Sequence, residues 1–156
     1  MPSNDVWLGK DAHMVHLVET RGDLFVQCPP HIPLAHCVSL DFHMNKGIAK
    51  IFKLRFGNVS FLKAQVQSVG QCATLNHEGR YIFYMATKHR FFHKPSYSSL
   101  AKSLQSLRCH METLGLSQLA IPRIATGLDN LEWSRVKEII MKTFSGSHIK
   151  IHVFYL

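Results

Sequence analysis

A turn of small residues followed by a single acid is where this sequence could do chemistry. Residues 121–133 read Ile-Pro-Arg-Ile-Ala-Thr-Gly-Leu-Asp-Asn-Leu-Glu-Trp. The small side chains of Ala125, Thr126 and Gly127 leave backbone N–H groups open to an anion, and the helix expected after them adds partial positive charge at its N-terminus. Ligands of open α/β sheets bind beyond the carboxyl ends of strands. The turn therefore predicts a phosphate ligand, most readily a diphosphate.

Two ionisable residues could act beside such a ligand, and each also has a simpler structural interpretation. Asp129 stands where a helix N-cap is expected, and Glu132 three residues later resembles the second half of a capping box. A cap of this kind contributes about 1 kcal/mol to stability, so no catalysis is needed to explain the acid. Lys88, in the segment 85–95, can equally be a solvated loop cation. In isolation, both residues are more simply explained by structure than by catalysis.

Cysteine and histidine spacings do not build a metal site. The four cysteines lie far apart, without a CxxC pair, and are expected to be small buried hydrophobic residues. Histidines form close pairs, but no pair belongs to an HExxH motif or has a clustered third ligand. These pairs are His13 with His16, His89 with His93, and His148 with His152. We therefore expect no metal and no other cofactor.

Composition places the chain among single globular domains. It has 156 residues, of which 46% are hydrophobic, and no apolar run approaches the roughly 20 residues needed to span a bilayer. The N-terminus lacks the pattern of a signal peptide, so we expect a soluble monomer of the nucleus or cytoplasm that does not bind membranes. A formal charge of +8 favours polyanionic partners. The alternation of cations and aromatics over residues 90–94 leaves nucleic acid open as one of them.

Periodicity predicts alternating strands and helices. The two expected strands nearest the middle of the chain flank a hairpin turn at residues 77–79, which requires at least one antiparallel pair. The alternation as a whole predicts a three-layer α/β domain with a mixed sheet. Expected strands cover residues 13–20, 34–40, 71–76, 81–87, 117–122 and 148–156, and expected helices cover residues 47–56, 59–66, 96–115 and 133–144.

Several segments occur together in an order that resembles the macrodomain family, specifically its terminal ADP-ribose protein glycohydrolase branch. They are Gly22–Phe25, Ala35–Ser39, Met44 with Gly47–Ala49, Gly79–Arg90, His93–Tyr97, Ile121–Trp133 and Ile149–Leu156. The resemblance runs from about Val15 to the C-terminus. It implies a three-layer α/β/α macrodomain with a mixed central sheet, spanning residues 1–156 as one domain with a loose N-terminal segment at 1–13.

The resemblance also implies an activity, which is removal of ADP-ribose from glutamate and aspartate side chains of modified proteins. It makes Lys88 and Asp129 catalytic: the lysine amine attacks the anomeric region of the distal ribose and displaces the protein carboxylate. The aspartate then helps to resolve the lysyl-ADP-ribose intermediate. In the family, an acid of the adenine-side loop accepts a hydrogen bond from the exocyclic amine of adenine, and Asp23 matches that acid. The positions that the resemblance places around ADP-ribose are Asp23, Leu24, Ser39, Gly47, Ile48, Arg123, Ile124, Ala125, Thr126, Gly127, Leu128 and Leu156.

Two stretches depart from the pattern of related sequences. Asn45-Lys46-Gly47 stands where they read Gly-Ala-Gly, and Ala125-Thr126-Gly127 stands where they read Gly-Cys-Gly. Each lost glycine costs up to a few kcal/mol if its position needs a positive φ. Lys46 offsets part of this cost if it faces a phosphate.

Three functions stay open at this point. The first is the glycohydrolase, with deacylation of O-acyl-ADP-ribose as a further activity. The second is a module that binds ADP-ribose without cleaving it, and the third is a nucleic-acid-binding protein. The presence of both Lys88 and Asp129 favours the enzyme. Its partners are ADP-ribose and ADP-ribosylated proteins, with poly(ADP-ribose) or nucleic acid bound through the basic surface.

We expect free ADP-ribose to bind with micromolar affinity and to raise the melting temperature by mass action. The motivation is the small anion-binding turn at 125–127 combined with Asp23. Titration calorimetry and thermal unfolding measure both effects. The absence of heat and of a thermal shift at millimolar ligand would contradict the prediction.

Overall fold

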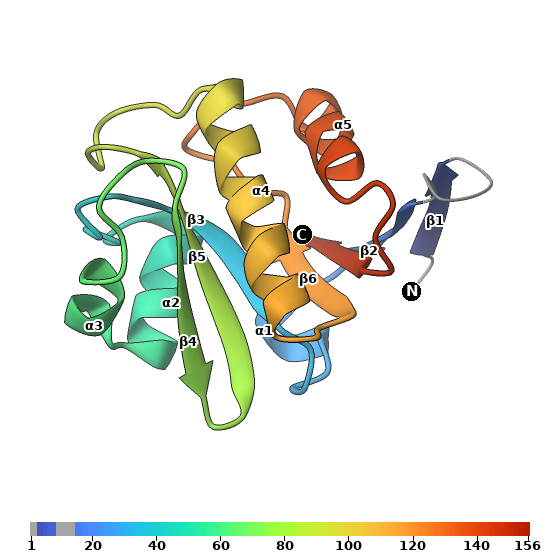
Figure 1. The fold of residues 1–156 in the computed structure, drawn as a ribbon, viewed down its shortest axis with the longest axis horizontal. Coiled ribbons are helices and arrows are strands. Elements are labelled where there is room, and N and C mark those ends of the chain that lie inside the picture. Colours follow the sequence, from blue (N-terminus) through green and yellow to red (C-terminus); the bar gives the residue numbers. More distant parts are fainter. Residues whose placement is uncertain (1–2, 9–14) are drawn as a thin grey trace.

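The computed structural model describes residues 3–8 and 15–156, in which one sheet is covered by helices on both faces (Figure 1). Within these ranges the strands are β1 (Ser3–Leu8), β2 (Val15–Arg21), β3 (Leu34–Ser39), β4 (Cys72–His77), β5 (Arg80–Lys88), β6 (Gln118–Pro122) and β7 (Lys150–Tyr155). The helices are α1 (Leu24–Gln27), α2 (Gly47–Phe56), α3 (Val59–Lys63), α4 (Tyr97–Thr113) and α5 (Trp133–Thr143).

The sheet has a parallel centre and antiparallel edges. Its strand order is β1-β2-β7-β6-β3-β5-β4, in which β2, β7, β6, β3 and β5 run parallel. At one edge β1 pairs antiparallel with β2, and at the other the β4–β5 hairpin turns through Glu78 and Gly79. Both turn residues have positive φ, 53° and 90°, which suits the right-handed twist of a two-residue hairpin. The mixed sheet and the hairpin at 77–79 are confirmed.

Strand side chains alternate between two cores, one on each face. In β5, Phe83 and Met85 pack in a cluster with α4 and α5, whereas Ile82 and Tyr84 pack in a cluster with α1, α2 and α3. This period of two is what a strand buried on both faces requires. Figure 1 shows α4 crossing in front of the strands. The predicted three-layer fold is thus confirmed.

Two elements were not predicted, both near the N-terminus. Residues 3–8 form β1, although we expected a loose segment over residues 1–13; residues 1–2 and 9–13 of that segment lie outside the described residues. Helix α1 has only four residues, which is too short to show a helical period. Asp23 begins it, because its side chain accepts a 2.8 Å hydrogen bond from the N–H of Phe25. None of the described helices is long and apolar enough to cross a membrane.

A reciprocal pair of hydrogen bonds fixes the start of α4. The hydroxyl of Ser96 accepts from the N–H of Ser99 at 2.9 Å, and the hydroxyl of Ser99 accepts from the N–H of Ser96 at 3.1 Å. This capping box follows directly from the predicted cap at Ser96. Because α4 begins shortly after Lys88, the position of its first turn also limits the path of the segment that joins β5 to α4.

Replacing Ser96 by alanine should lower the free energy of unfolding by about 1 kcal/mol, because the first turn of α4 loses its cap. Urea unfolding measures the change. Ser98→Ala is the matched control, since Ser98 is exposed in the same turn and its hydroxyl makes no hydrogen bond with the described residues. Equal losses in the two variants would contradict the capping role.

Candidate active site

One cleft of about 820 Å³ lies at the carboxyl ends of the parallel strands. It opens between β3 and β6. In the described residues these two strands pair only at Leu34 with Ala120, and they are unpaired from there to their carboxyl ends. Neighbouring strands lie about 4.8 Å apart, so the edge from β2 to β5, four intervals away, is about 19 Å long. Such a length suits a dinucleotide-sized ligand lying across the strands better than a single sugar.

Lys88 and Asp129 form an ion pair at the β5 end of this cleft. Lys88 is the last residue of β5, and Asp129 belongs to the loop between β6 and α5. The lysine Nζ donates to Asp129 Oδ1 at 2.7 Å, and only 15% and 16% of the two side chains are exposed. The fold thus brings together an amine and a carboxylate that are 41 positions apart in the chain.

The expected N-cap role of Asp129 is wrong. Helix α5 begins at Trp133 with Glu132 as its N-cap, and Glu132 makes no side-chain cap bond, so no capping box forms. The chain first makes a further turn, in which Leu131 N–H donates to Ala125 O at 2.8 Å and Asn130 adopts φ 62°. The expected support of the small turn by the α5 N-terminus is wrong for the same reason, since the helix does not start there.

The small turn itself presents an unbroken series of backbone donors. The N–H groups of residues 125–129 have no hydrogen-bond acceptor among the described residues. Ala125 adopts φ 62°, a conformation that costs a residue with a side chain about 1–2 kcal/mol. Position 125 therefore requires a positive φ although it holds a residue with a side chain. Gly127, by contrast, has no positive φ. A turn of this kind is a concave binding site for an anion.

The start of α2 forms the opposite wall. Gly47 begins the helix with φ 60°, and its N-cap Lys46 makes no side-chain bond, so the first N–H groups of α2 remain open to a ligand. A Cβ built on Gly47 would stand 3.4 Å from Cδ1 of Leu128. The two anion-binding elements therefore approach each other over the middle of the cleft.

The β2 end of the cleft offers an acid and apolar surface. Asp23 uses one carboxylate oxygen to cap α1, which leaves the other oxygen without a protein partner among the described residues. Buried Leu24 and exposed Leu156 line the same end. The N–H of Gly22 donates to Tyr155 O at 2.7 Å and holds the ends of β2 and β7 together.

A second acid, Asp41, holds the wall beside Lys88. It accepts from the hydroxyl of Ser39, from His43 N–H at 3.3 Å and from Phe91 N–H at 3.2 Å. Burial alone would raise the pKa of Asp41, but these donors bring it below the ordinary value. The Phe91 ring stacks on His43 with centroids 3.8 Å apart, and Lys94 Nζ donates to the carbonyl of Leu128. The segment after β5 is thereby fixed to both walls.

Every residue that the sequence assigned to the site lines this one cleft. The sequence did not assign Asp41, His43, Phe91 or Lys94 to this site, although Lys94 lies in a segment that carried the family resemblance and both Phe91 and Lys94 lie in the cation–aromatic stretch 90–94. It also missed His36, which is fully buried beneath the cleft and stacks on Phe52 at 3.7 Å. Burial lowers the pKa of His36 to about 3, so its imidazole is neutral at physiological pH.

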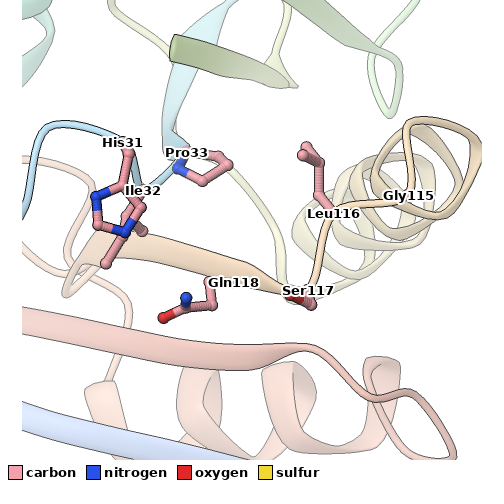
Figure 2. Close-up of a pocket in the computed structure, with 7 residues that line it drawn as sticks. All are labelled: His31, Ile32, Pro33, Gly115, Leu116, Ser117 and Gln118. Atoms are coloured by element: carbon pink, nitrogen blue, oxygen red, sulfur yellow. The ribbon is translucent and has the colours of Figure 1, made fainter.

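The rest of the described surface offers little else. A hollow of about 190 Å³ lies at the amino ends of β3 and β6, opposite the main cleft, and His31 is the only ionisable side chain of its lining (Figure 2). No group of three potential metal ligands occurs among the described residues; His13, of the pair with His16, lies outside them. The carboxyl-end cleft is therefore the candidate active site.

Known proteins resemble this chain in sequence and in structure. ADP-ribose glycohydrolase OARD1 of Homo sapiens is 42% identical over 149 residues, which cover 96% of this chain and 97% of that protein. The macrodomain of Thermus aquaticus DarG matches with a TM-score of 0.77 and 26% identity, covering 90% of this chain and 97% of that one. Thermosipho africanus DarTG in complex with ADP-ribose matches with a TM-score of 0.77 and 19% identity, over 90% and 41% of the chains. No family model matches.

Gly47→Ala should weaken ADP-ribose binding measured by calorimetry, because the new Cβ stands beside Leu128 and strains the first turn of α2. Gly57→Ala is the matched control at the other end of the helix. Gly57 has a similar φ of 57° but nothing within 4 Å of an added Cβ. Both variants should lose about 1–3 kcal/mol of stability, because alanine is strained at a positive φ. Weakened binding in both, or in neither, would contradict the assignment of Gly47 to the cleft.

Proposed function

This chain belongs to the macrodomain family of ADP-ribose glycohydrolases, and we propose that it releases ADP-ribose from glutamate and aspartate side chains through a covalent adduct on Lys88. The observation that carries the proposal is the 2.7 Å contact of Lys88 with Asp129 at one end of a cleft that has backbone anion sites in its middle. An amine, a proton acceptor and a phosphate site are the three groups that this chemistry needs.

The strand order supports one orientation of the ligand. Asp23, at the end of β2, would accept from the adenine amine through its free carboxylate oxygen. The diphosphate would lie between the N–H groups of residues 125–129 and the start of α2, in the middle of the edge. The distal ribose would then reach Lys88 at the end of β5. Each part of ADP-ribose thereby meets a group of matching chemistry.

The reaction balances with the residues at hand. Lys88 transfers a proton to Asp129, and its free amine forms a bond to the anomeric carbon of the distal ribose. The bond from that carbon to the substrate carboxylate breaks, and the carboxylate leaves with the electron pair. One proton of the attacking amine is lost to solvent as the carboxylate leaves. Water then adds to the same carbon and passes one proton to the lysine nitrogen as the carbon–nitrogen bond breaks, and Asp129 returns its proton to the lysine amine. The products are free ADP-ribose and the unmodified acidic side chain.

Each of the two alternative functions leaves one feature of the cleft unexplained. A module that only binds ADP-ribose has no use for a largely buried ion pair whose formation costs desolvation energy. A nucleic-acid-binding protein would use Phe91 and Phe92, which are exposed at the cleft, but it would not need the anion sites between β3 and β6. Deacylation of O-acyl-ADP-ribose is a compatible second activity, because it breaks an ester on the same ribose.

Lys88→Ala should abolish release of ADP-ribose from a glutamate-linked substrate while ADP-ribose binding stays nearly unchanged, because the lysine supplies a covalent step. Lys88→Arg is the control: arginine keeps the positive charge opposite Asp129 but stays protonated and cannot attack. Both variants should therefore be inactive. Activity in the arginine variant would show that only the charge matters and would contradict the adduct.

Asp129→Ala leaves water as the acceptor for the lysine proton and removes the acid that returns a proton to the departing lysine amine. Attack should slow less than resolution, so lysyl-ADP-ribose should accumulate, visible by mass spectrometry as added mass on Lys88. Its stability should not show the loss of a helix cap, since the N-cap position of α5 is occupied by Glu132 and not by Asp129. Wild-type turnover in Asp129→Ala, together with the absence of any mass increase on Lys88, would exclude the proposed mechanism.

A further inference from the structure

We propose that Glu19 is a positioning residue that closes the loop 123–132 at both of its ends and so sets the geometry of the anion-binding turn and of Asp129. Glu19 lies in β2, outside every segment that carried the family resemblance. The inference rests on the proposed function for the role of Asp129, but not for the binding of free ADP-ribose.

One carboxylate oxygen joins the two ends of the loop. Glu19 Oε1 accepts from Arg123 Nη2 at 3.4 Å, and it also accepts from Trp133 Nε1 at 2.9 Å. Arg123 is the first residue after β6, and Trp133 is the first residue of α5. The other oxygen, Oε2, accepts from Lys137 Nζ at 2.8 Å, one turn further along α5. The side chain of Glu19 is only 12% exposed, so water competes little for these bonds.

Aromatic contacts complete the closure. The guanidinium carbon of Arg123 lies 4.0 Å from the ring centre of Tyr155 and 5.7 Å from that of Trp133. Burial alone would raise the pKa of Glu19, but the bonds from Lys137 and Trp133 and the charge of Arg123 bring it below the ordinary value. The acid is therefore ionised at neutral pH, and both ends of the loop are held by charge-assisted or aromatic contacts.

The interior of the loop has few bonds of its own to fix its shape. Apart from its own short turns, it is held by the bond of Leu131 N–H to Ala125 O, by the bond of Glu132 N–H to the Tyr97 hydroxyl at 3.0 Å, and by the contacts of Leu128 and Asp129 with Lys94 and Lys88. A loop whose ends are fixed samples fewer conformations than one whose ends are free. Glu19 thus acts on the substrate through the positions of the backbone donors and of Asp129, without touching the substrate itself.

Electrostatics and positioning predict opposite effects for loss of this carboxylate. Removing a negative charge near a cleft that binds a diphosphate should tighten binding if only Coulomb attraction matters. Releasing the ends of the loop should weaken binding, because the donors at 125–129 must then be ordered when the ligand arrives. The sign of the change in affinity therefore separates the two explanations.

The experiment compares Glu19→Gln with Lys137→Met in the full chain. Glu19→Gln removes the charge that holds Arg123, and Lys137→Met removes the third donor while both loop ends stay bound. We expect Kd for free ADP-ribose to rise about tenfold in Glu19→Gln and kcat on glutamate-linked substrate to fall, with both unchanged in Lys137→Met. If Glu19→Gln does not fold, Trp133→Phe releases one end of the loop, keeps a ring there, and should raise Kd in the same direction.

Unchanged or tighter ADP-ribose binding in Glu19→Gln would overturn the inference, even if the melting temperature falls, because a purely structural role would lower stability alone. Equal losses of binding in Lys137→Met would overturn it as well, since that variant leaves the loop ends bound. The Kd measurement does not depend on hydrolysis. A wild-type chain that binds ADP-ribose but does not cleave the substrate would therefore count against the proposed function only. The role of Glu19 would still be tested by the Kd values of the variants.

Discussion

Parallel hydrogen bonding between β2, β7, β6, β3 and β5 forces the carboxyl ends of these five strands to one edge of the sheet (Figure 1). Every candidate site residue lies at or just beyond that edge, although the residues are drawn from the whole length of the chain. The sparse pairing of β3 with β6 then lets the edge open in its middle. Cleft position, ligand orientation and the meeting of Lys88 with Asp129 all depend on this one feature of sheet topology.

Most charged side chains at the cleft already have a protein partner. Lys88 is neutralised by Asp129, Arg123 is held by Glu19, and Asp41 is surrounded by donors. In the proposed complex, attraction for phosphate would therefore come mainly from backbone N–H groups, whose positions do not change with side-chain rotation. A site built in this way recognises the shape of a diphosphate, whereas the net charge of +8 acts on polyanions in general.

The sequence predicted the elements that have strong periodicity or clear caps. Helix α4, with Ser96 and its apolar stripe, and the β4–β5 hairpin are examples in which local propensity and tertiary structure agree. It failed where a short segment is decided by long-range contacts. Asp129 has the sequence context of a cap, but its partner is Lys88, and no local pattern could reveal a lysine 41 positions away.

Local patterns also could not identify Glu19. An acid in an apolar strand indicates at most that a partner is needed, and its donors come from residues more than 100 positions along the chain. Asp41 is similar, since one of its donors lies 50 positions away. What the family resemblance supplied was a set of residues that all line the cleft. The residues that hold those in place became visible only from the contacts in the structure.

The approach of Leu128 to Gly47 bears on how fast a ligand can enter and leave. Even a Cβ added to Gly47 would touch Leu128, so the two walls leave little room between them over the middle of the cleft. The obstacle is one largely exposed leucine side chain. Exposed side chains change rotamer within picoseconds to nanoseconds, without rearrangement of the backbone. Rotation of this one side chain would therefore widen the middle of the cleft on that timescale, without movement of either wall.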